Sequence, residues 1–184
     1  RAGIRLNRQV ENLLNMSRLE TGMFKPHLNW CDINELVFNI IQKVSIIPAL
    51  QHIRFTPDDN LPLFNLDTGL IEEVLYNIVQ NAIQYTPANS NILISAKYVE
   101  ENCVIKISDN GKGLPGNEIK FVFDKFYRLP HERTGGTGLG LSIAKGFVEA
   151  HNGIISVENN ELGGATFTIK IPAETSFVNK LKNE

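Results

Sequence analysis

The chain has 184 residues, of which 42% are hydrophobic, enough for the core of one domain with a short appendage. Its 18 Lys and Arg nearly balance 20 Asp and Glu, and no basic stripe alternates with aromatic residues, so we expect no nucleic acid partner. No apolar run approaches the roughly 20 residues that cross a bilayer. Because the chain begins at Arg1 without a signal-peptide pattern, we expect it to be a piece of a longer protein.

Neither the cysteines nor the histidines form a metal-binding or nucleophilic pattern. Cys31 and Cys103 stand far apart, which favours two structural thiols in a reducing compartment. We expect each of the four histidines to be a surface or turn residue; they are His27, His52, His131 and His151.

The first predicted element is a helix over residues 2–21, which Gly22 ends. Its apolar side chains recur at mostly helical spacing; they are Leu6, Val10, Leu13, Leu14 and Leu19. Such a stripe needs something to pack on. A two-helix hairpin or a dimer would supply it, and so would the helix's own domain.

Residues 24–31 predict a short edge strand, because Pro26 interrupts them. Asp32 then caps a helix that runs to Pro48, with Glu35 completing the capping-box pattern. Two short strands, 53–55 and 62–66, follow on either side of a turn.

A helix over residues 67–85 carries an unusual polar row on the side away from its apolar stripe. Glu73, Asn77 and Asn81 are spaced by four, so their side chains lie in one slowly rotating line. The row is either a solvated face or a site. Asparagine is a poor helix former and a solvated face would more usually hold Lys, Glu and Gln. Oxygen ligands in this arrangement suit Mg²⁺, with phosphates supplying further contacts.

Two alternating strands, 92–99 and 102–109, are predicted to pair in antiparallel fashion. The alternation places Asp109 on the same face as Ile107, and a buried carboxylate requires a partner. Gly111 and Gly113 follow and permit a close approach of backbone to a ligand. The alternative is an Asn-Gly turn that Asp109 merely caps.

From residue 114 onward, the sequence predicts a lid, a glycine-rich turn and two strands. Residues 114–134 form a long connection that is more typical of a functional lid than of a slack loop, with the aromatic residues Phe121, Phe123, Phe126 and Tyr127. The run 135–141 opens a helix and offers its backbone N–H groups to phosphate. Strands at 154–158 and 165–171 follow, and the residues after Pro172 read as a polar tail.

Taken together, these motifs resemble the catalytic ATP-binding domain of sensor histidine kinases, within the gyrase/Hsp90/MutL type of ATPase. Five sequence boxes occur in the family's order: 77–81 (N box), 109–113 (G1), 123–126 (F box), 136–141 (G2) and 163–167 (the last glycine box). The resemblance implies an α/β fold, a two-layer sandwich of a mixed, mainly antiparallel sheet with about three helices on one face, preceded by one helix of a dimerisation hairpin.

The N-terminal helix, ending in residues 17–22, resembles the second helix of the family's dimerisation and phosphotransfer hairpin. The implied division is 1–22 for this helix, 23–175 for the catalytic domain and 176–184 for the tail. Residues 19–30 and 146–151 are similar to the potassium-responsive branch of these kinases.

The resemblance also implies roles for particular residues, with ATP and Mg²⁺ as cofactors. Asp109 would accept a hydrogen bond from the adenine amino group, Asn81 would bind Mg²⁺, Asn77 would lie near the phosphates and Glu73 would act as a base. The other implied nucleotide contacts are Tyr85, Gly111, Gly113, Phe126, Gly136, Thr137, Gly138, Leu139, Gly140 and Thr166. The resemblance also implies two partners, a response regulator and a second copy of the protein. It further implies that the chain is a cytoplasmic domain of a membrane-anchored sensor.

Two departures from the family pattern matter. Gln84 stands where many members carry Lys or Arg, which removes a cation from the neighbourhood of the phosphates. The helix with the phosphoacceptor His is absent, so we expect ATP binding without autophosphorylation. A degenerate, non-catalytic nucleotide-binding module and an ATPase of the gyrase/Hsp90/MutL kind are the alternatives.

Overall fold

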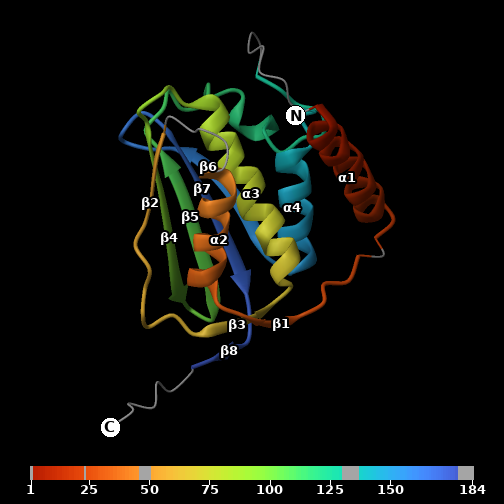
Figure 1. Ribbon diagram of the computed structural model, residues 1–184, viewed down its shortest axis with the longest axis vertical. Coiled ribbons are helices and arrows are strands. Elements are labelled where there is room, and N and C mark those ends of the chain that lie inside the picture. Colours follow the sequence, from red (N-terminus) through yellow and green to blue (C-terminus); the bar gives the residue numbers. More distant parts are fainter. Residues whose placement is uncertain (1, 23, 46–50, 130–136, 178–184) are drawn as a thin grey trace.

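The computed structural model describes residues 2–22, 24–45, 51–129 and 137–177, which form a twisted sheet covered on one face by helices (Figure 1). The larger sheet has the strand order β2-β4-β5-β7-β6. Its strands are β2 (His52–Phe55), β4 (Asn91–Val99), β5 (Asn102–Asp109), β6 (Ile154–Asn159) and β7 (Ala165–Pro172). β2 runs parallel to β4, and the other neighbours are antiparallel. The expected mixed, mainly antiparallel sheet is confirmed.

Three helices pack side by side on this sheet and close the core, and the fourth lies outside them against α4 (Figure 1). They are α2 (Ile33–Ser45), α3 (Thr68–Tyr85) and α4 (Gly140–Ala150), with α1 (Ala2–Glu20) on the outside; a 3₁₀ turn, η1, covers Ile119–Phe121. The alternation of β5 buries Ile105, Ile107 and Asp109 together, as the sequence predicted. Their burial against the apolar faces of the helices holds the two layers together.

A second, smaller sheet lies at the end of the domain and consists of β1 (Asn29–Cys31), β3 (Leu63–Leu66) and β8 (Thr175–Ser176). The edge strand predicted over 24–31 is therefore limited to its last three residues. The polar-tail prediction is wrong for residues 175–176, because these pair with β3. Phe177 follows and its ring lies 6.2 Å from that of Tyr98.

The predicted cap of α2 is present, and α3 is capped as well. Asp32 Oδ1 accepts the backbone N–H of Asn34 at 2.8 Å and that of Glu35 at 3.3 Å. Asp67 caps α3 through Oδ1, which accepts Leu70 N–H at 3.1 Å, and its Oδ2 accepts His27 N–H at 2.8 Å. The segment that leaves α1 is thereby tied to the start of α3.

His151 differs from the surface residue that the sequence suggested. It does lie in a turn, at the end of α4, but its side chain is only 6% exposed. Asp67 N–H donates to Nε2 at 3.1 Å, so the ring proton resides on Nδ1, which donates to Phe147 O at 2.8 Å. His151 thus joins the C-terminal end of α4 to the N-terminal end of α3.

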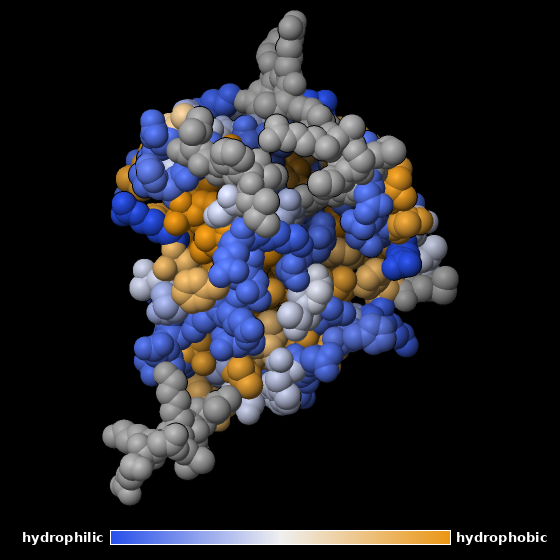
Figure 2. Space-filling view, in the orientation of Figure 1, coloured by the Kyte–Doolittle hydropathy of each residue, from blue (hydrophilic) through white to orange (hydrophobic). Residues whose placement is uncertain are grey.

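Helix α1 packs against α4, and Leu19 makes a close contact there. A Cβ at Gly146 would lie 2.6 Å from Leu19 Cδ1, so the absence of a side chain there admits Leu19. Lys125 Nζ pairs with Glu20 Oε1 at 2.5 Å, both side chains being about half exposed. The apolar residues Val10, Leu13 and Leu14 remain about half exposed, and Figure 2 shows apolar surface at the outer edge of the molecule where α1 lies.

The two cysteines are buried free thiols, as expected for structural residues. Burial raises the pKa of the Cys31 thiol, and burial raises that of Cys103 still further. Of the helices in the part of the chain that the structure describes, none combines the length and apolar character needed to cross a membrane.

Candidate functional site

A cavity opens where the C-terminal half of α3, the end of β5 and the lid segment meet. Its walls combine apolar and polar side chains; they are Asn81, Ala82, Tyr85, Thr86, Asp109, Lys112, Gly113, Leu114, Val122, Tyr127, Arg128, Leu129, Leu141, Ala165 and Phe167. An apolar cavity with a few polar groups is the usual form of a small-molecule site. The structure thus brings three separate sequence motifs to one place.

Asp109 lies at the floor of this cavity with its side chain 8% exposed. Its Oδ1 accepts the N–H groups of Gly111 at 2.8 Å and Ala165 at 3.4 Å. Among the described residues, none donates to Oδ2. The carboxylate is therefore held through Oδ1, and Asp109 lines the cavity.

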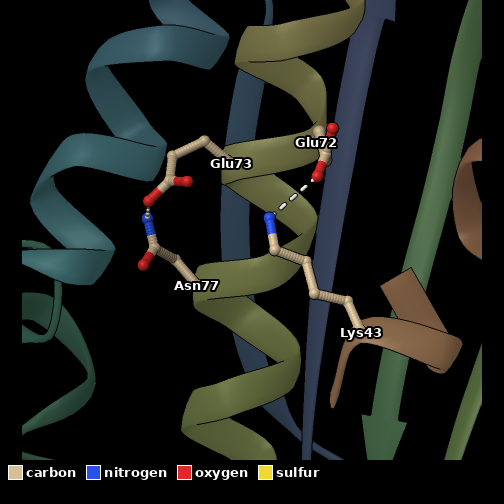
Figure 3. A network of polar contacts seen from close by, with 4 residues as sticks. All are labelled: Lys43, Glu72, Glu73 and Asn77. Carbon is tan, nitrogen blue, oxygen red and sulfur yellow. Dashed lines mark hydrogen bonds and ion pairs between the residues drawn. The ribbon is translucent and has the colours of Figure 1, made fainter. Parts of the chain in front are cut away.

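Glu73 and Asn77, two members of the polar row, lie on the side of α3 that faces α4 (Figure 3). Asn77 is 7% exposed, and its Nδ2 donates to Glu73 Oε1 at 3.3 Å. A Cβ at Gly140 would lie 3.3 Å from Asn77 Oδ1, so the first residue of α4 is close to this amide oxygen. The interpretation of the row as a solvated face is wrong at Asn77. Glu72, one residue from Glu73, points instead to Lys43 of α2 at 2.9 Å (Figure 3).

Asn81 is the member of the row that reaches the cavity. Its amide oxygen is a hard donor of the kind that Mg²⁺ binds, and Mg²⁺ commonly retains water and takes phosphate oxygens for its other positions. Within the described ranges, no three His, Cys, Asp or Glu side chains converge on a metal position. Asn81 is therefore able to supply one oxygen ligand to an Mg²⁺ whose other ligands are water and phosphate oxygens.

The glycine-rich turn meets the lid segment through backbone atoms. Gly138 has a φ of +73°, and a Cβ there would lie 2.7 Å from the carbonyl carbon of Phe126. Phe126 N–H donates to Gly138 O at 3.0 Å. Leu139 is buried and precedes α4, and its carbonyl accepts Ile143 N–H. Thr137 is half-buried, whereas Gly136 lies outside the described residues.

Some predicted site residues do not line the cavity. Glu73 and Asn77 lie beside it along α3, and the side chain of Phe126 is 65% exposed. Thr166 is on the opposite face of the sheet from Asp109, where its hydroxyl lies 2.9 Å from that of Ser108. The structure therefore does not place the Thr166 side chain in the site.

Sequence reasoning missed the cations of the site. Lys112 and Arg128 both line the cavity, whereas Gln84, the position where a cation was expected, is exposed and is not part of the wall. Lys112 was visible between the two glycines of its motif, and Arg128 directly follows the aromatic cluster of the lid. Tyr127, Leu141 and Phe167 also line the cavity, although none of them was among the predicted nucleotide contacts.

Comparison with known proteins adds the family. A family model described as the histidine kinase-, DNA gyrase B- and HSP90-like ATPase matches residues 66–175. The chain belongs to this ATPase family. The match contains α3 with its polar row, the Asp109 turn, the lid, α4 and the last two strands of the large sheet.

Within this ATPase family, the similar proteins are sensor histidine kinases. The chain is 36% identical over 171 residues to the sensor protein KdpD of Escherichia coli (strain K12), a match that covers 92% of this chain and 19% of KdpD. It is 36% identical over 176 residues to the sensor histidine kinase WalK of Bacillus subtilis (strain 168), covering 91% of this chain and 28% of WalK. The chain thus spans less than a third of the length of either relative.

Solved structures from this ATPase family show the same fold. Full-length ShkA in complex with AMPPNP superposes with a TM-score of 0.84 at 26% identity, over 96% of this chain and 38% of that one. The catalytic domain of the histidine kinase ThkA superposes with a TM-score of 0.71 at 28% identity, over 79% of this chain and 95% of that one. The chain therefore contains the catalytic ATPase-type domain of a sensor histidine kinase.

Proposed function

We propose that the chain binds ATP with Mg²⁺ in the cavity around Asp109 and transfers the γ-phosphoryl group to a histidine on a dimerisation helix outside this chain. The observation that carries this proposal is the buried Asp109 carboxylate, which is fixed through Oδ1 and receives no hydrogen bond at Oδ2 from the described residues. An acceptor held at the floor of an apolar cavity suits the exocyclic amino group of adenine, which is a donor.

The other groups around the cavity support a triphosphate extending from the adenine. Lys112 and Arg128 supply positive charge, and Asn81 supplies an oxygen for the Mg²⁺ that would travel with the nucleotide. The N-terminus of α4 offers backbone N–H groups beside Asn77. Bound Mg²⁺ would neutralise phosphate charge, and the chain's own residues position the nucleotide.

Phosphoryl transfer would form a bond between phosphorus and a ring nitrogen of the acceptor histidine and break the bond from phosphorus to the oxygen that leaves with ADP. Glu73 is the proposed base, and its hydrogen bond to Asn77 sets its orientation along α3. Tyr85 lines the cavity and would pack near the nucleotide, while Gly138 and Gly140 permit the close approach of lid and helix.

The place of the domain in a longer protein is also a proposal. We infer that residues 1–22 are the C-terminal part of a hairpin helix and residues 23–175 the catalytic domain, while Ser176 of the expected polar tail pairs with β3. The half-exposed apolar stripe of α1 supports a partner helix or a second copy there. We further propose that a response regulator accepts the phosphoryl group. The whole protein would be a membrane-anchored sensor, with potassium as its stimulus.

The first test is calorimetric titration of AMPPNP, with and without Mg²⁺, into the chain and into Asp109→Asn. The substitution places an amide where a charged acceptor stood, and losing such a hydrogen bond corresponds to roughly 10- to 100-fold weaker binding. Asp59→Asn, at an exposed turn position, is the matched control. Equal affinity of the parent and Asp109→Asn, or no binding by the parent, would refute the site.

The second test separates the kinase from its alternatives. A hairpin bearing an acceptor histidine is added in trans with ATP and Mg²⁺. Phosphohistidine on the hairpin supports the kinase, binding without turnover supports a degenerate module, and release of free phosphate supports an ATPase of the gyrase/Hsp90/MutL kind. Gln84 lies outside the cavity wall, and the cations Lys112 and Arg128 line it. The lack of a cation at position 84 is therefore a weaker argument for a degenerate module.

A further inference from the structure

Two consecutive asparagines follow the core of β6 and point back toward the Asp109 turn. Asn159 Oδ1 accepts Leu114 N–H at 2.8 Å, and its Nδ2 donates to Leu114 O at 2.7 Å. One amide side chain therefore satisfies both backbone groups of Leu114, as a neighbouring strand would. Leu114 is the residue that leaves the glycine turn and lines the cavity.

Asn160 binds the backbone of Asp109, the residue at which the chain enters the turn. Its Nδ2 donates to Asp109 O at 2.9 Å and to Thr166 Oγ1 at 3.3 Å. Its Oδ1 accepts Leu162 N–H at 3.0 Å and Gly164 N–H at 3.1 Å. The side chain is thus fully engaged, with both ends fixed to backbone.

The pairing of strands explains why these side chains are needed. The ladder between β5 and β7 ends at the pair Ser108 and Thr166, one residue before Asp109. Beyond that point β7 provides no strand partner for the Asp109 carbonyl, and Asn160 takes its place. Thr166, which does not reach the cavity, accepts from Asn160 and so helps to hold it.

The two turns also pack together without side chains between them. A Cβ at Gly113 would lie 2.7 Å from Asn159 Oδ1 and 2.8 Å from Gly163 O. A Cβ at Gly164 would overlap the carbonyl oxygen of Asp109. The backbones of the two turns are therefore in direct contact, in addition to the hydrogen bonds of Asn159 and Asn160. This contact leaves little room for the Asp109 turn to shift.

We propose that Asn159 and Asn160 are positioning residues for adenine recognition, with Asn160 setting Asp109 and Asn159 setting Leu114 on the other side of the turn. This inference rests on the proposed function. Neither asparagine touches the cavity, and both act through the residues that line it.

Asn160→Asp and Asn159→Asp test the proposal because each keeps the shape and the accepting oxygen and loses the donor. Asn152→Asp, in the exposed turn that precedes β6, is the control for the added charge. We expect about tenfold faster amide hydrogen exchange at Gly111 and Ala165 in Asn160→Asp, and about tenfold weaker AMPPNP binding in both variants. The control should change neither.

A double-mutant cycle with Asp109→Asn shows whether Asn160 acts through Asp109. In the Asp109→Asn background, Asn160→Asp should change AMPPNP affinity by less than about twofold, because the acceptor that it positions is gone. A full tenfold loss in both backgrounds, or unchanged exchange at the named amides, would overturn the proposal. If the parent binds AMPPNP and the variants match it, this inference alone fails. If the parent does not bind, the proposed function fails and this inference fails with it.

Discussion

Replacing Gly164 by alanine is the sharpest test of how the candidate site is built. The added Cβ would overlap the carbonyl oxygen of Asp109 and lie 2.5 Å from its Oδ1. Both obstacles belong to a residue fixed by the sheet and by Asn160, so neither can rotate away. Overpacking a close-packed site costs about 1–3 kcal/mol. For a chain of this size, that corresponds to a fall of roughly 2–12 °C in Tm.

The assay is thermal unfolding followed by circular dichroism, together with AMPPNP titration. We expect Gly164→Ala to lose both stability and at least about tenfold in affinity, because relief of the overlap must displace the Asp109 carboxylate. Gly116→Ala is the matched control, since a Cβ there meets nothing within 4 Å. Its stability should stay the same or rise by up to about 1 kcal/mol. A Gly164→Ala protein that melts and binds like the parent would refute the described packing of the two turns.

Three further predictions concern other parts of the molecule. Gly138→Ala should weaken AMPPNP binding at least about fivefold in calorimetry with a smaller effect on Tm, because its positive φ and the Phe126 backbone exclude a Cβ at the edge of the lid; equal affinity would count against the lid contact. His151→Phe should lower the free energy of unfolding by about 1–3 kcal/mol in urea titration, because Asp67 N–H loses its acceptor, whereas His52→Phe, at an exposed position, should have little effect. Cys31 and Cys103 should resist a thiol reagent until the chain unfolds. Because the pKa values of both thiols are raised in the folded state, the stability that the neutral thiols contribute is complete below the ordinary pKa of 9.0. That contribution declines as the pH rises above 9.0, which urea titrations at pH 8 and pH 10 would measure.

Periodic features of the chain were predictable because they repeat within a short window. The apolar stripe predicts the buried face of α3, and the alternation of β5 predicts that Asp109 is buried. The row of Glu73, Asn77 and Asn81 was also visible, since a spacing of four needs only the geometry of one helix. The spacing did not reveal that Asn77 would be buried against α4.

Contacts between single residues that are far apart in the chain produce no repeating pattern in the sequence. Asn160 reaches Asp109 across 51 residues, and His151 reaches Asp67 across 84. Each is one polar side chain bonded to one backbone group, which creates no repeat in the sequence. The pairing of β8 with β3 was missed for a similar reason, because its two residues are too few to show alternation.

The meeting of the Asp109 turn with the β6–β7 turn bears on inhibitor resistance. This wall of the cavity owes its shape to main-chain atoms and to glycines that admit no Cβ, such as Gly113 and Gly164. A compound that binds it would contact surface that a point mutation cannot reshape without also displacing Asp109. We expect resistance to such a compound to arise instead from the lid, where the walls are side chains such as Val122, Tyr127 and Arg128.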